Sequence, residues 1–151
     1  MNFTLEGRIL KYVNEDCILI KQKNGNWKDI SICINKYGYK VINLNKKQFM
    51  LHRIIGYLFL GLEIYNLNLY IDHIDKNRCN NNLNNLRIVT HQENDFNRTA
   101  KGYSFCKQTN KWRASIKYGN IQKTIGRYNT PEEARQAYLD AKEIYHIILE
   151  K

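Results

Sequence analysis

The residues of this chain that can do chemistry gather between positions 72 and 94. Asp72 and His73 are neighbours at the end of an apolar stretch, and Asn94 follows in a polar segment. Carboxylate and amide oxygens suit a hard cation such as Mg²⁺, which takes few protein ligands and keeps several waters. A histidine beside such a cation can accept a proton from an attacking water. The set therefore indicates hydrolysis of a phosphodiester, with one metal ion stabilising the leaving oxygen.

A run of asparagines separates the Asp-His pair from Asn94. Residues 77–85 read N-R-C-N-N-N-L-N-N, which is either low complexity from AT-rich coding or a loop that needs short amide side chains. We expect Asn77 and Asn81 to make hydrogen bonds in this loop, because Asn side chains bond the backbone in turns. Asp75 most simply serves the turn before Asn77, with an auxiliary metal role as the alternative.

Short elements must hold these residues in place. Residues 69–73 read as a strand, residues 86–89 as a second strand, and the Asn-rich stretch as the loop between them. Thr90 and Glu93 fit a capping box, which predicts a helix over residues 91–98. Strand, loop, strand and helix form a compact ββα unit, in which one cleft can take the carboxylate, the imidazole and the amide.

Patterned segments flank this unit on both sides. Short alternating apolar runs before it predict strands joined by turns, followed by a short helix at 52–60. After it, Thr130-Pro131-Glu132-Glu133 is a second capping box with Pro at the first helical position. The expected C-terminal elements are strands at 103–107, 111–118 and 121–128 and a helix from 131 to about Leu149.

The expected fold class is α+β, in three parts. An N-terminal β-rich segment covers residues 1–50, and the central ββα-metal unit covers residues 51–98. A C-terminal three-stranded antiparallel sheet packed on one helix covers residues 101–149.

Charge and composition narrow the class of function. The net charge of +10 and the pI near 9.5 point to a polyanionic partner. The longest apolar run, residues 54–60, is too short to span a bilayer, which favours nucleic acid over a membrane. The N-terminus lacks the pattern of a secretory signal, so an intracellular protein is expected. Four widely spaced cysteines without a C-x-x-C motif predict free thiols and no structural zinc.

The stretch from Leu51 to Asn97 resembles the HNH endonuclease family, particularly the homing-endonuclease branch of phages and large DNA viruses. The resemblance rests on L-H-R-I-I-G-Y-L-F, then D-H-I-D-x-N, then N-N-L-R-I-V-T-x-x-E-N. It implies that His73 is the general base and that Asp72 and Asn94 bind one divalent cation, Mg²⁺ first and Mn²⁺ as the alternative. It also implies that Asn85 ties the loop to the strand and holds the histidine in position. In this branch the last motif position is Asn, as here.

The C-terminal segment, residues 101–148, resembles the Apetala/ethylene-response-factor DNA-binding domain. The match is carried by G-Y-S-F-C-K-Q-T-N-K-W-R-A-S-I and by Q-K-T-I-G-R-Y-N-T-P-E-E-A-R-Q-A-Y. That family lays a three-stranded sheet in the major groove. Strand alternation independently places Ala114 and Ile116 under the helix and their neighbours outward. The expected DNA-contact residues are Lys107, Thr109, Arg113, Ser115, Lys117, Gln122 and Thr124. Several are Arg or Trp in the plant relatives, so the plant target sequence does not carry over.

Other basic residues have less specific expectations. His52 is expected to have a core or capping role, and His146 to favour the dipole of the last helix. Arg53, Arg78 and Arg87 are candidates to neutralise phosphates, with a solvated surface role as the alternative.

Two functions of different classes remain open. The first is a metal-dependent DNA endonuclease that acts as a monomer on duplex DNA and uses its C-terminal segment for specificity. The second is a DNA-binding regulator with an inactive nuclease centre, against which the presence of Asp72, His73 and Asn94 argues. A third interpretation, RNA binding, rests on charge alone.

Overall fold

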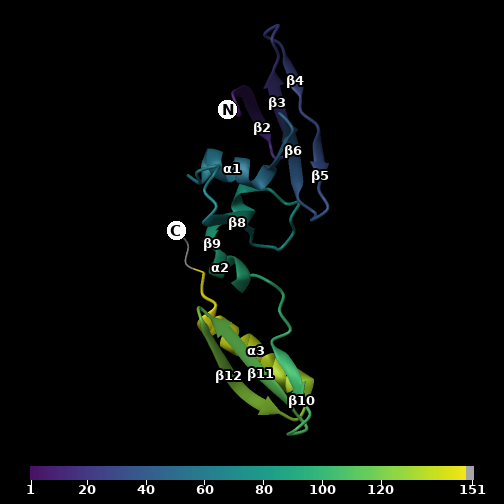
Figure 1. The fold of residues 1–151 in the computed structure, drawn as a ribbon, viewed down its shortest axis with the longest axis vertical. Helices are drawn as coiled ribbons and strands as arrows, with labels where there is room; N and C mark the ends of the chain where they lie inside the picture. The colour runs from purple at the N-terminus through teal and green to yellow at the C-terminus, as the bar shows by residue number, and fades with distance from the viewer. Residues whose placement is uncertain (149–151) are drawn as a thin grey trace. The chain divides into compact units, whose positions relative to one another are not determined.

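A computed structural model describes residues 1–148 of the chain (Figure 1). The chain divides into two compact units, Met1–Ile88 and Val89–Lys151. Each unit consists of small sheets and short helices, in agreement with the mixed α and β composition expected from the sequence. Within the described residues, no helix has the length and apolar character needed to cross a membrane.

The first unit begins with a four-stranded sheet in the order β1-β2-β3-β4. Its strands are β1 (Asn2–Leu5), β2 (Arg8–Asn14), β3 (Cys17–Lys21) and β4 (Trp27–Asp29). Glu6 and Gly7 both have positive φ, which is the geometry of a two-residue hairpin between paired strands. Leu10 and Ile18 are fully buried and turn one face of this sheet into the core.

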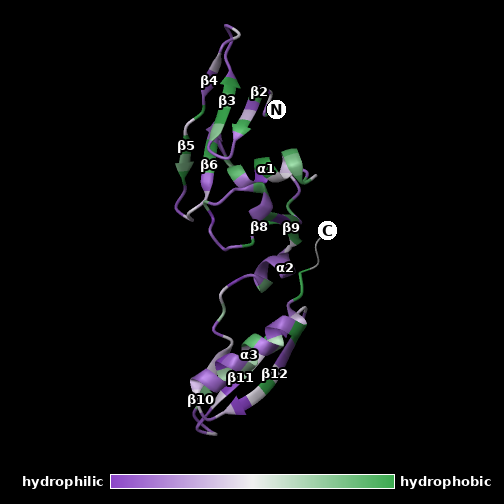
Figure 2. Cartoon of the chain, turned by 180° about the vertical axis from the view of Figure 1, so that it is seen from behind, coloured by the Kyte–Doolittle hydropathy of each residue, from purple (hydrophilic) through white to green (hydrophobic). Residues whose placement is uncertain are grey.

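A second sheet and a helix complete the scaffold of this unit. The sheet contains β5 (Ile32–Ile34), β6 (Lys40–Leu44) and β7 (Lys47–Met50), and α1 (Leu51–Phe59) follows directly. The apolar residues of α1 and β3 stand out in green in Figure 2. A methyl group on Gly56 would lie 2.5 Å from the Ile71 side chain, so glycine lets α1 pack closely on β8 (Leu69–His73). This close packing fixes the strand that ends at His73.

The predicted strand, loop and strand are present. β8 pairs with β9 (Leu86–Thr90) in a two-stranded sheet, and the Asn-rich loop between them ends in the short 3₁₀ helix η1 (Leu83–Asn85). Arg53 of α1 donates hydrogen bonds to the carbonyl oxygens of Ile64, Asn66 and Leu69. The guanidinium of Arg53 therefore supports the segment that leads into β8, a use that differs from the phosphate contact considered from the sequence.

The second unit begins with α2 (His91–Phe96) and continues with a sheet covered by a helix. The sheet order is β10-β11-β12, with β10 (Tyr103–Cys106), β11 (Lys111–Tyr118) and β12 (Ile121–Tyr128). Helix α3 (Pro131–Tyr145) covers one face of this sheet, where Ile116, Tyr138 and Ala141 are buried together. Both predicted capping boxes, on α2 and on α3, are formed.

All three α-helices end earlier than the sequence predicts, and α1 does so by one residue, at Phe59 instead of Leu60. α2 ends at Phe96 instead of Arg98, and α3 ends at Tyr145 instead of near Leu149, which itself lies outside the described residues. His146 leaves the helical conformation because its ring has other partners. Its Nε2 donates to the carbonyl oxygen of Lys117 at 2.8 Å, and its ring stacks on Phe96 at 4.1 Å between centroids.

Candidate functional site

Asp72 and His73 occupy the last two positions of β8. Both side chains are buried, with exposed fractions of 6% and 4%. Oδ2 of Asp72 accepts hydrogen bonds from Nε of Arg87 at 2.9 Å and from a terminal nitrogen of Arg87 at 2.8 Å. The guanidinium compensates the charge of a nearly buried carboxylate, which would otherwise be strongly unfavourable. Arg87 is thus engaged by Asp72 in this structure, whereas the sequence suggested a phosphate contact for it.

The imidazole of His73 is held on one edge and by neighbouring rings. Its Nε2 lies 3.0 Å from Oδ1 of Asn81. The ring of His52 meets it edge to face at 5.1 Å between centroids, and the ring of Tyr39 lies at 6.0 Å. Hydrogen bonding and packing together restrict the orientation of this histidine.

His52 has the core role that the sequence predicts. It is the second residue of α1 and is 4% exposed. Burial lowers the pKa of His52 to about 3, with further contributions from His73 and Arg53. No described residue gives its Nδ1 a hydrogen-bond partner. His52 therefore stays neutral at physiological pH, and its ring packs against the ring of His73.

The depressed pKa of His52 predicts a pH-dependent stability of the first unit. Because the unfolded chain binds a proton near pH 6.5 and the folded chain does not, stability should fall as the pH drops below 6.5. The slope should approach about 1.4 kcal/mol per pH unit above pH 4. Urea unfolding followed by Trp27 fluorescence in a Trp112→Phe background, at pH 7.5, 6 and 4.5, measures this slope.

His52→Gln is the matched variant for this measurement and should flatten the slope between pH 6.5 and 4.5. Hydrogen bonds from the Asn80 side chain and the Asn77 amide lower the pKa of Asp75. The Asp75 carboxylate therefore affects the pH dependence of stability only at more acidic pH. An unchanged slope in His52→Gln would show that another group carries the effect.

The asparagines between β8 and β9 build a network of turns. The Asp75 carboxylate accepts hydrogen bonds from the Asn77 amide and the Asn80 side chain, both at 2.8 Å. The side chains of Asn77, Asn80 and Asn82 each accept from the backbone two residues further on. The expected loop hydrogen bonding of Asn77 and the turn role of Asp75 are confirmed. These asparagines therefore have structural roles that low complexity alone would not explain.

Asn85 connects this loop to the residues after His73. Its Oδ1 accepts from the Asp75 amide at 3.0 Å, while its Nδ2 donates to Asp75 Oδ1 and to the Asn80 carbonyl. Its own carbonyl accepts from the Ile74 amide at 2.9 Å. Asn85 thus ties the loop to the strand end.

The loop is also anchored to the N-terminal segment. Arg78 donates to the carbonyl oxygen of Tyr37 at 2.8 Å, and its guanidinium lies over the ring of Tyr39. The thiol of Cys79 donates to the Gly38 carbonyl. Arg78, another candidate for phosphate contact, is therefore used within the unit. The sequence does not single out Tyr39, because a tyrosine next to a turn gives no indication of which residues it contacts in the fold.

Asn94 lies in α2 and is half-buried. It belongs to the unit Val89–Lys151, whereas Asp72, His73 and Asn85 belong to Met1–Ile88. Thr90 and Glu93 fix the start of α2 through bonds of 3.3 Å and 2.7 Å. Phe96 attaches the other end of α2 to His146.

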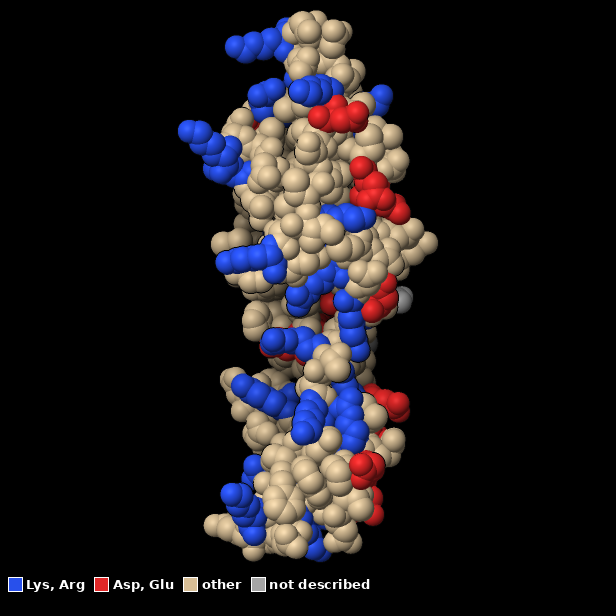
Figure 3. Space-filling view, turned by 90° about the vertical axis from the view of Figure 1, so that its right-hand side faces the viewer, with Lys and Arg blue, Asp and Glu red and all other residues tan. Residues whose placement is uncertain are grey.

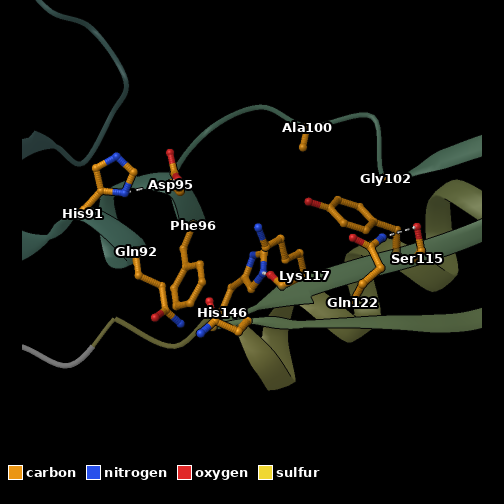
Figure 4. A pocket seen from close by; sticks show the side chains of 13 residues that line it. His91, Gln92, Asp95, Phe96, Ala100, Gly102, Ser115, Lys117, Gln122 and His146 are labelled. Atoms are coloured by element: carbon orange, nitrogen blue, oxygen red, sulfur yellow. Dashed lines mark hydrogen bonds and ion pairs between the residues drawn. The ribbon is translucent and has the colours of Figure 1, made fainter.

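A groove of about 600 Å³ lies between α2 and the sheet of the second unit (Figure 4). His91 and Gln92 of α2 line one side, and Lys117 and Gln122 line the other. His91 forms an exposed ion pair with Asp95 at 3.6 Å. Three of the residues predicted to contact DNA thus line this groove, namely Ser115, Lys117 and Gln122.

The sheet face opposite α3 displays most of the predicted DNA-contact residues. Lys117 pairs with Gln122 and Ser115 with Thr124, and the Gln122 amide donates to the Ser115 hydroxyl. Arg113 is exposed on the same strand. Lys107 and Thr109 are exposed in the turn between β10 and β11. The structure therefore gathers five of the seven on one face and leaves two in the adjoining turn.

Arg127 joins this face and was missed by strand alternation. It pairs with Arg113, because a bulge shifts the register of β11 against β12 between Ala114 and Ser115. Without the bulge, Arg127 would share the inward side of Ile125. In the space-filling view, Lys and Arg side chains are spread over the visible face of each unit, and most of the visible Asp and Glu side chains lie toward the right-hand side (Figure 3).

Comparison with known proteins gives a family match over the stretch that contains Asp72, His73, Asn85 and Asn94. Residues 49–96 match a family model described as HNH endonuclease. An uncharacterized HNH endonuclease of Acanthamoeba polyphaga mimivirus is 37% identical over 118 residues, which is 74% of this chain and 61% of that protein. The chain thus spans about three fifths of that relative's length. A solved structure described as DNA binding and cleavage by the HNH homing endonuclease I-HmuI gives a TM-score of 0.46 at 26% identity, over 95% of this chain and 87% of the other.

Proposed function

We propose that this chain, which carries an HNH endonuclease domain in residues 49–96, hydrolyses phosphodiester bonds in duplex DNA with the help of a divalent cation. The observation that carries the proposal is the buried Asp72-His73 pair at the end of β8, inside the matched stretch. The basic surface supports a polyanionic substrate. In this proposal the protein acts as a monomer with three segments: a β-rich N-terminal segment (1–50), the nuclease unit (51–98) and the DNA-binding segment (101–149).

His73 serves as the general base in this proposal. A neutral imidazole takes the proton from the attacking water, and its fixed orientation limits the geometries that the ring can adopt. Asn85 maintains the strand end on which the histidine stands, through its bonds to Asp75 and Ile74. The chain's own residues thus bind, orient and deprotonate the nucleophile.

Asp72 and Asn94 would hold the cation. The described residues contain no cluster of three or more His, Cys, Asp or Glu side chains arranged for a metal. One carboxylate and one amide oxygen fit Mg²⁺ or Mn²⁺, which retain several waters. When bound, such a cation stabilises the charge on the leaving oxygen.

The C-terminal segment supplies DNA binding in the manner of an Apetala/ethylene-response-factor domain. Three antiparallel strands covered by one helix, with a polar and basic opposite face, support this part of the proposal. The proposed contact residues are Lys107, Thr109, Arg113, Ser115, Lys117, Gln122 and Thr124. We add Arg127 to them because it pairs with Arg113 on the same face.

Lys117→Ala and Arg127→Ala should each weaken DNA binding and reduce the salt slope of log K by about 1, because each removes one phosphate contact. Fluorescence anisotropy with a DNA duplex between 50 and 200 mM NaCl measures both quantities. Lys123→Ala is the matched control, since Lys123 lies in the same sheet but pairs with Ile116 and bonds Tyr145 of α3. Equal losses in all three variants would contradict the assignment of this face.

A pool of plasmids with random inserts tests the nuclease proposal without knowledge of the target. The native protein should produce nicked or linear DNA with Mg²⁺ or Mn²⁺ and none with EDTA, and sequencing of the ends should reveal a shared site. Retention of specific plasmids without any cleavage would favour the regulator with an inactive centre.

A further inference from the structure

We infer that Asn81 is a positioning residue that fixes the tautomer and the orientation of His73. The catalytic meaning of this inference rests on the proposed function, whereas the tautomer itself does not. Asn81 stands in the middle of the Asn-rich loop, where nothing in its sequence context distinguishes it from its neighbours.

The contact between the two side chains is buried and direct. Oδ1 of Asn81 lies 3.0 Å from Nε2 of His73, and the two residues are 2% and 4% exposed. Water therefore has little access to compete for this bond, and a buried polar pair of this kind restricts both groups. The neighbouring asparagines differ, since the side-chain oxygens of Asn80 and Asn82 accept hydrogen bonds from backbone amides of the loop.

The chemistry of the amide dictates which ring nitrogen carries the proton. A side-chain carbonyl oxygen can only accept a hydrogen bond, so Nε2 of His73 must be the donor. In a neutral imidazole the other nitrogen, Nδ1, then holds the lone pair. Asn81 thereby designates Nδ1 as the nitrogen that acts as a base.

Stability alone does not explain an amide at this position. Nδ2 of Asn81 is buried, and the described residues offer it no hydrogen-bond partner. A buried donor without a partner is unfavourable, and an apolar side chain of the same size would avoid that loss. The buried Nδ2 therefore lowers the stability of the protein. We attribute the presence of Asn at this position to the hydrogen bond between its Oδ1 and His73.

The rings around His73 complete the restriction. The ring plane of His52 stands at 77° to that of His73, and the ring plane of Tyr39 is tilted against it at 39°. Asn81 therefore sets the position of the ring edge, while His52 and Tyr39 limit rotation of the ring plane. The three residues come from the loop, from α1 and from the turn before β6.

The first test reads the tautomer by NMR in the metal-free, full-length protein labelled with ¹⁵N-histidine at pH 8. Long-range correlations should show His73 protonated at Nε2 in the native protein. Asn81→Leu, which keeps the size but removes the acceptor, should give mixed tautomers, and Asn81→Asp should restore the Nε2–H form. Asn84→Ala, an exposed change in the same loop, is the matched control and should leave the spectrum of His73 unchanged.

The second test separates positioning from binding. Asn81→Leu should lower kcat for DNA cleavage by about 10- to 100-fold with little change in KM, the size expected for the loss of a supporting hydrogen bond. Asn81→Asp should recover most of the rate. An Nδ1–H tautomer in the native protein, or an unchanged tautomer in Asn81→Leu, would overturn the inference. A native protein that never cuts DNA would instead overturn the proposed function and leave the NMR result intact.

Discussion

His73→Ala is expected to lower the single-turnover rate of DNA cleavage by about 10²- to 10⁴-fold, the usual contribution of a general base. The histidine is buried at the end of β8 and held by Asn81, His52 and Tyr39. No other histidine of the first unit can replace it, because His52 has a pKa of about 3 and is enclosed in the core. The rate of product formation under excess enzyme measures the loss.

His91→Ala is the matched control for this prediction. His91 is exposed in α2 and pairs with Asp95, so its loss should leave the cleavage rate within a small factor of the native value. DNA affinity, measured with EDTA present, should be unchanged in His73→Ala. A parallel loss of affinity and rate would indicate a folding defect instead of a missing base.

Arg87→Ala is expected to destabilise the first unit by about 3 kcal/mol, because it removes the guanidinium that compensates the charge of the buried Asp72 carboxylate. The value lies at the lower end of the range for buried pairs because the Arg87 side chain is 27% exposed. The double variant Asp72→Asn, Arg87→Ala should regain part of the stability, since no buried charge then remains. Urea unfolding of the native protein, of Arg87→Ala, of Asp72→Asn and of the double variant completes the double-mutant cycle.

Arg78→Ala is the control for this prediction. Arg78 lies in the same unit and donates a hydrogen bond to a backbone carbonyl, so its loss should lower the stability by about 1 kcal/mol or less.

Unfolding of the same variants in the presence of Mg²⁺ also tests Asp72 as a cation ligand by linkage. Millimolar Mg²⁺ should stabilise Arg87→Ala more than the double variant, because only the former retains the carboxylate. Equal effects of Mg²⁺ on both variants would argue against Asp72 as a ligand.

Local patterns were sufficient to predict the C-terminal sheet. Strands 111–118 and 121–128 were predicted to the residue because alternation and turn residues agree there. The face of Arg127 could not be predicted, since the bulge that reverses its side is set by the pairing of two strands. The end of α3 could not be predicted either, because His146 has distant partners in Phe96 and Lys117.

The candidate site shows the same division between local and tertiary information. The placement of Asp72 and His73 at a strand end and the cap of α2 follow from short-range pattern, and the structure agrees. The contacts of Asn81 and Tyr39 with His73 depend on how a loop and a turn fold over β8, which no spacing rule encodes. Three arginines that were candidates for phosphate contact bond groups within the fold, because buried acceptors need donors: Arg53 and Arg78 bond carbonyl oxygens, and Arg87 bonds Asp72.

Cleavage of a plasmid that carries the site recovered from the random pool is the measurement that decides whether this protein is a nuclease with His73 as its base. Native protein and His73→Ala are compared with Mg²⁺, with Mn²⁺ and with EDTA. We expect nicked or linear product that requires both the cation and His73. Cleavage by His73→Ala at the native rate would contradict the assignment of the base, and cleavage in EDTA would contradict the role of the metal.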